Sequence, residues 1–155
     1  MKTSNFLLPK GLRPLGIIFV VVGLFLLFLK YKFNYKPDFL NLKVFAFYSF
    51  YIEARSFTTI THQMIEDIAG ILLLAGLFMV AFTREKDESE GLNALRLKAF
   101  VVTAYLNLVY LLASILFFFG FGFVGALTFF MVFWLASYLV TFRILMYRNK
   151  KEEPI

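Results

Sequence analysis

The sequence contains no cysteine and only one histidine. The absence of cysteine excludes disulfide scaffolds, thiolate nucleophiles, thiol redox chemistry and zinc sites built on cysteine. The sequence also contains no P-loop, no G-x-S-x-G and no H-E-x-x-H motif. We therefore expect a protein that is not an enzyme and that uses no cofactor.

Charge is missing from three long stretches of the chain, at 14–29, 68–83 and 99–142. Hydrophobic residues make up 61% of the sequence and aromatic residues 20%, whereas soluble domains are about 45–50% apolar. A soluble core cannot bury this excess, so the stretches are expected to face lipid. The basic residues lie between the apolar stretches, so anionic lipid headgroups explain them better than nucleic acid does.

The uncharged stretches predict four transmembrane helices in an all-α membrane protein. Residues 99–142 would extend roughly 66 Å as one helix, about twice the ~30 Å hydrocarbon core, so they must form two spans. The glycines at Gly120 and Gly122 favour a reversal there, which makes the third and fourth helices an antiparallel hairpin. The chain is then a single integral membrane domain, residues 1–155, with spans at about 14–33, 64–83, 97–119 and 123–143 and an external segment at about 34–61.

The distribution of Lys and Arg predicts the orientation. Eleven of the 16 fall in the N-terminal segment, the loop at 84–98 and the C-terminal end, and five fall between the first two spans. Because positive loops stay in the cytoplasm, both termini should be cytoplasmic in a multi-pass protein of a bacterial inner membrane. Lys30 to Phe33 follow the first uncharged stretch, where a cleavable signal would have small residues, so we expect an uncleaved anchor.

The external segment combines aromatic with β-branched residues and is compatible with a short β element. Its aromatic rings suit either of two roles. They rest among lipid headgroups as an interfacial cap, or they form a surface that binds a protein partner. The candidate partner-binding residues are Phe45, Phe47, Tyr48, Phe50, Tyr51 and Phe57.

A stripe of small and polar residues follows one side of the third span: Thr103, Asn107, Tyr110 and Ser114. Their spacing places them on one helix face. Such residues promote helix association in membranes through close approach and interhelical hydrogen bonds. We interpret the stripe as a packing face; the alternative gives Asn107 a role in binding a substrate. On the second span, Gly76 belongs to a similar set of small residues at heptad spacing.

His62 and Glu66 are the closest approach to a metal site. They share a helix face only if the second helix begins before His62. Two ligands are fewer than a structural metal site requires, so we expect no metal there. A polar helix start at the outer interface is the simpler interpretation.

Residues 66–76, 82–86 and 95–97 resemble segments of small, uncharacterised four-helix bacterial integral membrane proteins. The resemblance implies the four-helix topology. It implies no activity and no site residue.

Two functions remain open, and a third hypothesis is a membrane enzyme that uses His62 and Glu66. The first is a non-enzymatic accessory or sensing component of the membrane, which binds a protein partner or a second copy of itself through the external aromatic segment or its helix faces. The alternative is an oligomeric small-molecule transporter or channel subunit. Coupled transport usually requires an ionisable residue inside the membrane, and no predicted span has one near its middle.

Overall fold

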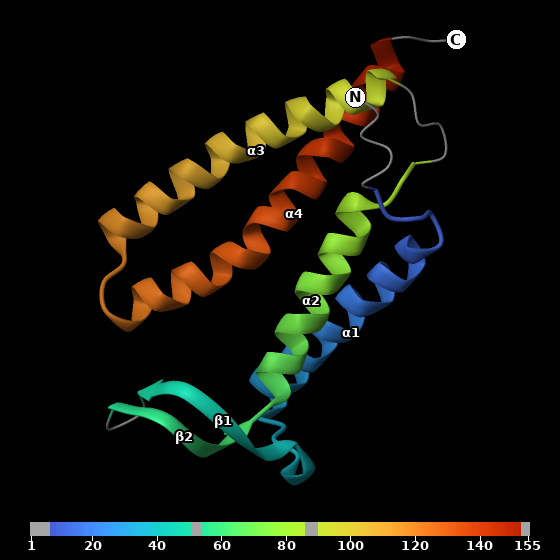
Figure 1. Ribbon diagram of the computed structural model, residues 1–155. Helices are drawn as coiled ribbons and strands as arrows, with labels where there is room; N and C mark the ends of the chain where they lie inside the picture. Colours follow the sequence, from blue (N-terminus) through green and yellow to red (C-terminus); the bar gives the residue numbers. More distant parts are fainter. Residues whose placement is uncertain (1–6, 51–53, 86–89, 153–155) are drawn as a thin grey trace. The chain divides into compact units, whose positions relative to one another are not determined.

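The computed structural model describes residues 7–50, 54–85 and 90–152, which are mostly helical (Figure 1). Two β-strands interrupt the helices between the first and second spans, so the short β element expected there is confirmed. The elements are α1 (Leu12–Phe33), the short 3-10 helix η2 (Asp38–Leu40), β1 (Asn41–Phe50), β2 (Ala54–Gln63), α2 (Ile65–Phe82), α3 (Glu90–Phe117) and α4 (Phe121–Glu152).

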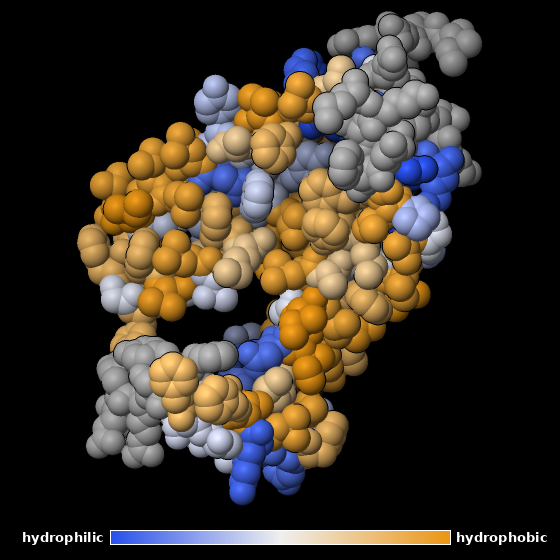
Figure 2. All heavy atoms as spheres, viewed as in Figure 1, coloured by the Kyte–Doolittle hydropathy of each residue, from blue (hydrophilic) through white to orange (hydrophobic). Residues whose placement is uncertain are grey.

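All four α-helices are long and apolar enough to cross a membrane. Apolar residues cover most of their visible surface in Figure 2. Charges at the ends of α1 and α2 complement the helix dipoles: Lys30 and Lys32 lie in the last turn of α1, and Glu66 and Asp67 lie in the first turn of α2. The prediction of four apolar helices of membrane-spanning length is confirmed.

The chain divides into two compact units, which are described separately. Unit 1 consists of residues 1–20 and 73–155, and unit 2 consists of residues 21–72. Helices α1 and α2 each begin in one unit and end in the other. Unit 1 also contains α3 and α4, and unit 2 contains the β-hairpin.

In unit 2, β1 and β2 form an antiparallel hairpin that pairs from Asn41↔Gln63 to Phe50↔Ala54. Backbone contacts tie its base to the neighbouring residues. The amide of Met64 donates to the carbonyl oxygen of Leu40 at 3.0 Å, and Gln63 Nε2 donates to the carbonyl oxygen of Pro37 at 3.3 Å. The hairpin is therefore held where it joins α2.

In unit 1, α3 and α4 lie side by side along their length (Figure 1). The chain between them occupies residues 118–120, and Gly120 has a φ of 58°, a left-handed conformation that glycine adopts without a steric penalty. Gly122 lies inside α4.

The buried core of unit 1 contains a column of aromatic rings from α2 and α4. Phe82 stacks on Tyr138 with ring centroids 5.7 Å apart, and Tyr138 stacks on Phe142 at 6.3 Å. The guanidinium of Arg96, on α3, lies 5.4 Å from the centroid of the Phe142 ring, a cation–π contact. Three helices thus meet in this column.

Candidate functional site

One face of the β-hairpin presents exposed aromatic rings. Phe45 is 59% exposed and Phe57 is 72% exposed, and their ring centroids lie 6.5 Å apart across the strands. Because side chains alternate along a strand, Thr59 and Thr61 share this face, and both are exposed. The half-buried Val44 and the residues in register with it belong to the opposite face. The hairpin therefore has one face exposed and rich in aromatic surface.

Phe57 also has an unusual backbone. The register passes from Ala46↔Thr58 to Tyr48↔Ser56, and Phe57, between these pairs, has a φ of 52°. A left-handed φ at a bulky residue costs on the order of 1–3 kcal/mol, and such strain is concentrated at functional sites.

The other candidate aromatic residues of this segment are only partly described. Phe47, Tyr48 and Phe50 occupy positions in β1, but their side chains lie outside the described part of the structure. Tyr51 lies outside the described residues altogether. Of the candidate aromatic residues, only Phe45 and Phe57 therefore have side chains that the structure describes.

Polar side chains at the base of unit 2 form a group of three residues around Glu66 and a pair of His62 with Asp67. Glu66 accepts a hydrogen bond from the Tyr31 hydroxyl at 3.0 Å and forms an ion pair with Lys30. His62 Nε2 lies 2.7 Å from Asp67 Oδ2.

His62 and Glu66 do not form the helical pair that a metal site would require. His62 belongs to β2 and Glu66 belongs to α2, which begins only at Ile65. Their four-residue spacing therefore does not place them on one helix face. Among the described residues, no group of three His, Asp or Glu side chains has the arrangement of a metal site.

In unit 1, two glycines allow α1 and α2 to approach closely. A Cβ atom placed on Gly76 would lie 2.7 Å from the carbonyl oxygen of Gly16 and 2.8 Å from the amide nitrogen of Val20. A Cβ atom on Gly16 would lie 2.8 Å from Met79 Cβ. Small residues permit this kind of backbone contact between membrane helices. Heptad spacing of small residues indicates Gly76 in the sequence, whereas its partner, Gly16, has no such signal.

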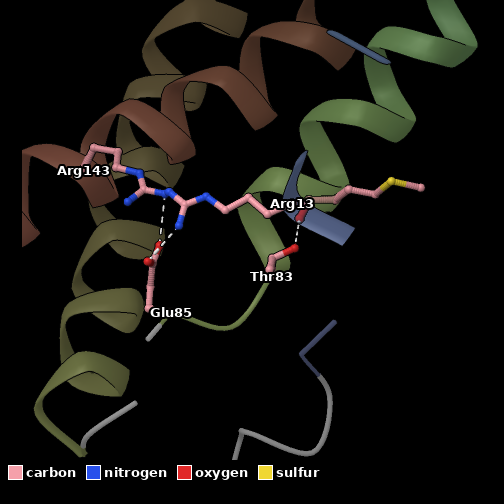
Figure 3. A network of polar contacts seen from close by, with 5 residues as sticks. Arg13, Thr83, Glu85 and Arg143 are labelled. Atoms are coloured by element: carbon pink, nitrogen blue, oxygen red, sulfur yellow. Dashed lines mark hydrogen bonds and ion pairs between the residues drawn. The ribbon is translucent and has the colours of Figure 1, made fainter. Parts of the chain in front are cut away.

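A charged network joins the start of α1, the residues after α2 and the last third of α4 (Figure 3). Glu85 Oε2 lies 2.9 Å from Arg13 Nη1, and Glu85 Oε1 lies 3.0 Å from Arg143 Nη2. The Glu85 side chain is only 15% exposed. One carboxylate therefore bridges two arginines from different helices.

Backbone hydrogen bonds flank this network. Leu8 donates its amide to the carbonyl oxygen of Phe82 at 2.9 Å, and Leu8 accepts from the amide of Arg84 at 3.0 Å. The Thr83 hydroxyl donates to the carbonyl oxygen of Met79 one turn earlier in α2 (Figure 3). The segment before α1 is thereby fixed beside the end of α2.

The polar stripe of α3 faces α4. Thr103, Asn107 and Ser114 are buried. Asn107 Nδ2 donates to the carbonyl oxygen of Thr103 at 2.8 Å and, at 3.4 Å, to Ser137 Oγ on α4. Ser114 donates within its own helix.

Tyr110 makes the strongest interhelical contact of the stripe. Its hydroxyl donates to the carbonyl oxygen of Ala126 at 2.9 Å, and its ring stacks on Phe133 with centroids 4.8 Å apart. Such interhelical hydrogen bonds contribute on average about 0.6 kcal/mol in membranes. The donors of Asn107, Tyr110 and Ser114 therefore bond within α3 or to α4, whereas Thr103 Oγ1 and Asn107 Oδ1 are buried without a hydrogen-bond partner among the described residues.

Unit 1 also contains an apolar cleft of about 690 Å³, lined by residues from α2, α3 and α4. Its volume is typical of a ligand-binding site. The lining is formed by leucines, a methionine and aromatic residues, which include Phe78, Phe82, Phe100, Trp134 and Tyr138. No lining residue is charged, so the cleft suits an apolar occupant.

Comparisons with family models, with curated proteins and with solved structures gave no match for this chain. The interpretation of its function therefore rests on the residues and their geometry.

Proposed function

We propose that the protein is a non-enzymatic accessory or sensing component of a membrane, which binds a protein partner through the external hairpin. The observation that supports this best is the exposed pair of Phe45 and Phe57 on a two-stranded hairpin. Aromatic rings offer a large apolar area with few rotatable bonds, and they are enriched at interaction hot spots.

The backbone at Phe57 adds independent support. A strained residue persists only when the surrounding structure holds it, and strain of this kind is found more often at binding sites than in inert loops. A headgroup anchor would need only an aromatic ring at the right depth, which an unstrained strand residue supplies equally well. The left-handed φ at Phe57 therefore favours a surface of defined shape.

The contacts of the α3 stripe favour this function over a transporter or channel. A polar path needs groups that face water or substrate, whereas Thr103, Asn107 and Ser114 are buried, and the hydrogen bonds of the Asn107 amide nitrogen and the Ser114 hydroxyl go to α3 and α4. We assign the stripe to packing between two helices that form an antiparallel hairpin in the membrane.

We place the protein in a bacterial inner membrane with both termini in the cytoplasm, as the excess of basic residues in the loop at 84–98 and at the two ends predicts. Because the chain contains no cysteine, a single introduced cysteine is the only thiol that can be labelled. Its labelling therefore shows on which side of the membrane that position lies. In intact cells, an impermeant thiol reagent should label Asn41→Cys and should not label Glu88→Cys. Labelling of Glu88→Cys alone would reverse the orientation.

A photoreactive amino acid at position 57 tests the binding proposal, because it reacts with whatever contacts the hairpin. We expect a cross-linked product between this chain and one protein of defined mass, and we expect Phe45→Ser to reduce it at least several-fold by removing the neighbouring ring. The exposed Thr61→Ser variant, on the same face, is the matched control and should leave the product unchanged. If irradiation gives only lipid adducts, the hairpin is an interfacial anchor.

The apolar cleft of unit 1 is the second surface on which a partner would pack, through a transmembrane helix. The same photoreactive group at position 78, on the half-exposed Phe78 of the cleft, tests that surface. A protein adduct at position 78, together with only lipid adducts at position 57, would indicate that the partner binds the helix faces and not the hairpin.

A further inference from the structure

A groove of about 200 Å³ lies between the first part of α3 and the last part of α4, within unit 1. Leu95, Lys98, Leu145, Arg148 and Asn149 line it. Both cationic residues are exposed and the two leucines are half-buried. The groove therefore combines two positive charges and an amide with apolar walls.

Among the side chains that the structure describes, no carboxylate forms an ion pair with either cation of the groove. The ion pairs among these side chains involve Arg13, Arg143, Lys30 and His62, and none involves Lys98 or Arg148. Two like charges that line one groove repel each other unless an anion lies between them. The groove is thus electrostatically suited to an anionic ligand.

The position of the groove along the helices indicates the source of that anion. Lys98 is the last charged residue before the uncharged stretch 99–142, and Arg148 follows soon after that stretch ends. The groove therefore lies at the edge of the apolar length of both helices, where lipid headgroups are found. Basic sites between transmembrane helices on the cytoplasmic side bind anionic lipid headgroups.

We propose that this groove binds the phosphate of an anionic phospholipid. The Arg148 guanidinium is suited to a two-point contact with the phosphate oxygens, and Lys98 contributes a compact positive charge. Asn149 offers an amide donor. Leu95 and Leu145 provide apolar contact for the glycerol and acyl portion of the same molecule, which a free phosphate ion would not use.

The test uses the full chain in a neutral detergent, titrated with phosphatidylglycerol or with phosphatidylcholine of identical acyl chains. Native mass spectrometry counts the bound lipid. The unmodified protein should retain phosphatidylglycerol in preference to phosphatidylcholine. In Lys98→Gln/Arg148→Gln its affinity should fall about twenty-five-fold, since each cation near a membrane surface contributes roughly a factor of five.

Two control variants distinguish specific lipid binding in the groove from nonspecific attraction of an anionic lipid to basic residues. Lys32→Gln/Lys36→Gln removes the same charge from exposed positions of unit 2 and should change binding less than two-fold. Lys98→Arg/Arg148→Lys keeps the charge and should retain most of the affinity, which also checks that substitution at these positions leaves the protein folded.

Three outcomes would overturn the proposal. The first is equal retention of phosphatidylglycerol by the unmodified protein and Lys98→Gln/Arg148→Gln. The second is an equal loss in Lys32→Gln/Lys36→Gln. The third is displacement of phosphatidylglycerol by excess inorganic phosphate, which would make the groove a site for a free anion.

Discussion

Gly76→Ala should lower the free energy of unfolding by about 3 kcal/mol or more, at or above the upper end of the usual cost of overpacking. The added Cβ would meet the carbonyl oxygen of Gly16 at 2.7 Å and the amide nitrogen of Val20 at 2.8 Å. Both are backbone atoms of α1, so no side-chain rotation relieves the clash, and the two helices must separate. Titration of a denaturing detergent into mild micelles measures the loss.

Gly70→Ala is the matched control, because Gly70 lies in the same helix with nothing within 4 Å of its added Cβ. Alanine is favoured over glycine inside a helix by up to about 1 kcal/mol, so this variant should be as stable as the unmodified protein or slightly more stable. Equal losses in the two variants would show that the Gly16–Gly76 approach does not determine the packing of α1 on α2.

Glu85→Gln should be the second most damaging substitution, with an expected loss of about 1–3 kcal/mol. Removing one partner of a buried ion pair costs about 3–5 kcal/mol, but the Arg13 and Arg143 side chains are 33% and 31% exposed, so water reduces the penalty. The substitution leaves two arginines facing each other without a carboxylate. Unfolding measured at low and at high salt should show a smaller loss at high salt, since salt screens their repulsion.

The triple variant Arg13→Gln/Glu85→Gln/Arg143→Gln tests whether the three residues act as a unit. It removes the unpaired cations together with the carboxylate, so it should be less destabilised than the sum of the three single substitutions. Strict additivity would mean that Glu85 does not bridge the two arginines.

The helices were predictable because lipid-facing segments exclude charge over a fixed length. The uncharged stretches at 68–83 and 99–142 predict the existence of α2 and of the pair of α3 and α4, although α3 begins earlier, at Glu90, and α4 continues to Glu152. Glycine propensity explains the break at Gly120. The β-hairpin was indicated by the mixture of aromatic and β-branched residues between the first two spans. Its register was not, because β1 has aromatic residues at both odd and even positions, so the pattern does not fix which face is buried or which pairing forms.

The contacts between helices were less predictable. A hydropathy pattern does not fix how a helix is rotated when both of its neighbours are apolar, so nothing marked Gly16 as the partner of Gly76. The segment at 84–98 contains several acidic and basic residues, and its sequence does not indicate that Glu85 is the one that pairs with Arg13 and Arg143. The left-handed φ at Phe57 has no sequence signal, because bulky residues rarely adopt it.

The position at which β2 ends excludes a helical metal-binding pair of His62 and Glu66. Sequence spacing allowed His62 and Glu66 to share a helix face, but strand pairing continues through Gln63. His62 is therefore a strand residue and lies beside Asp67.

The contacts that hold unit 1 together join residues at very different separations in the sequence, and this affects the order in which they form during synthesis. Arg13 and Glu85 are 72 positions apart, whereas Tyr110 and Ala126 are 16 apart. Contacts between distant residues form more slowly than local ones, since a longer loop must close. Since α2 ends only at Phe82, α1 has to wait for its partner until the ribosome has added more than half of the chain. During that interval Gly16 lacks the contact with Gly76 that it makes in the folded protein.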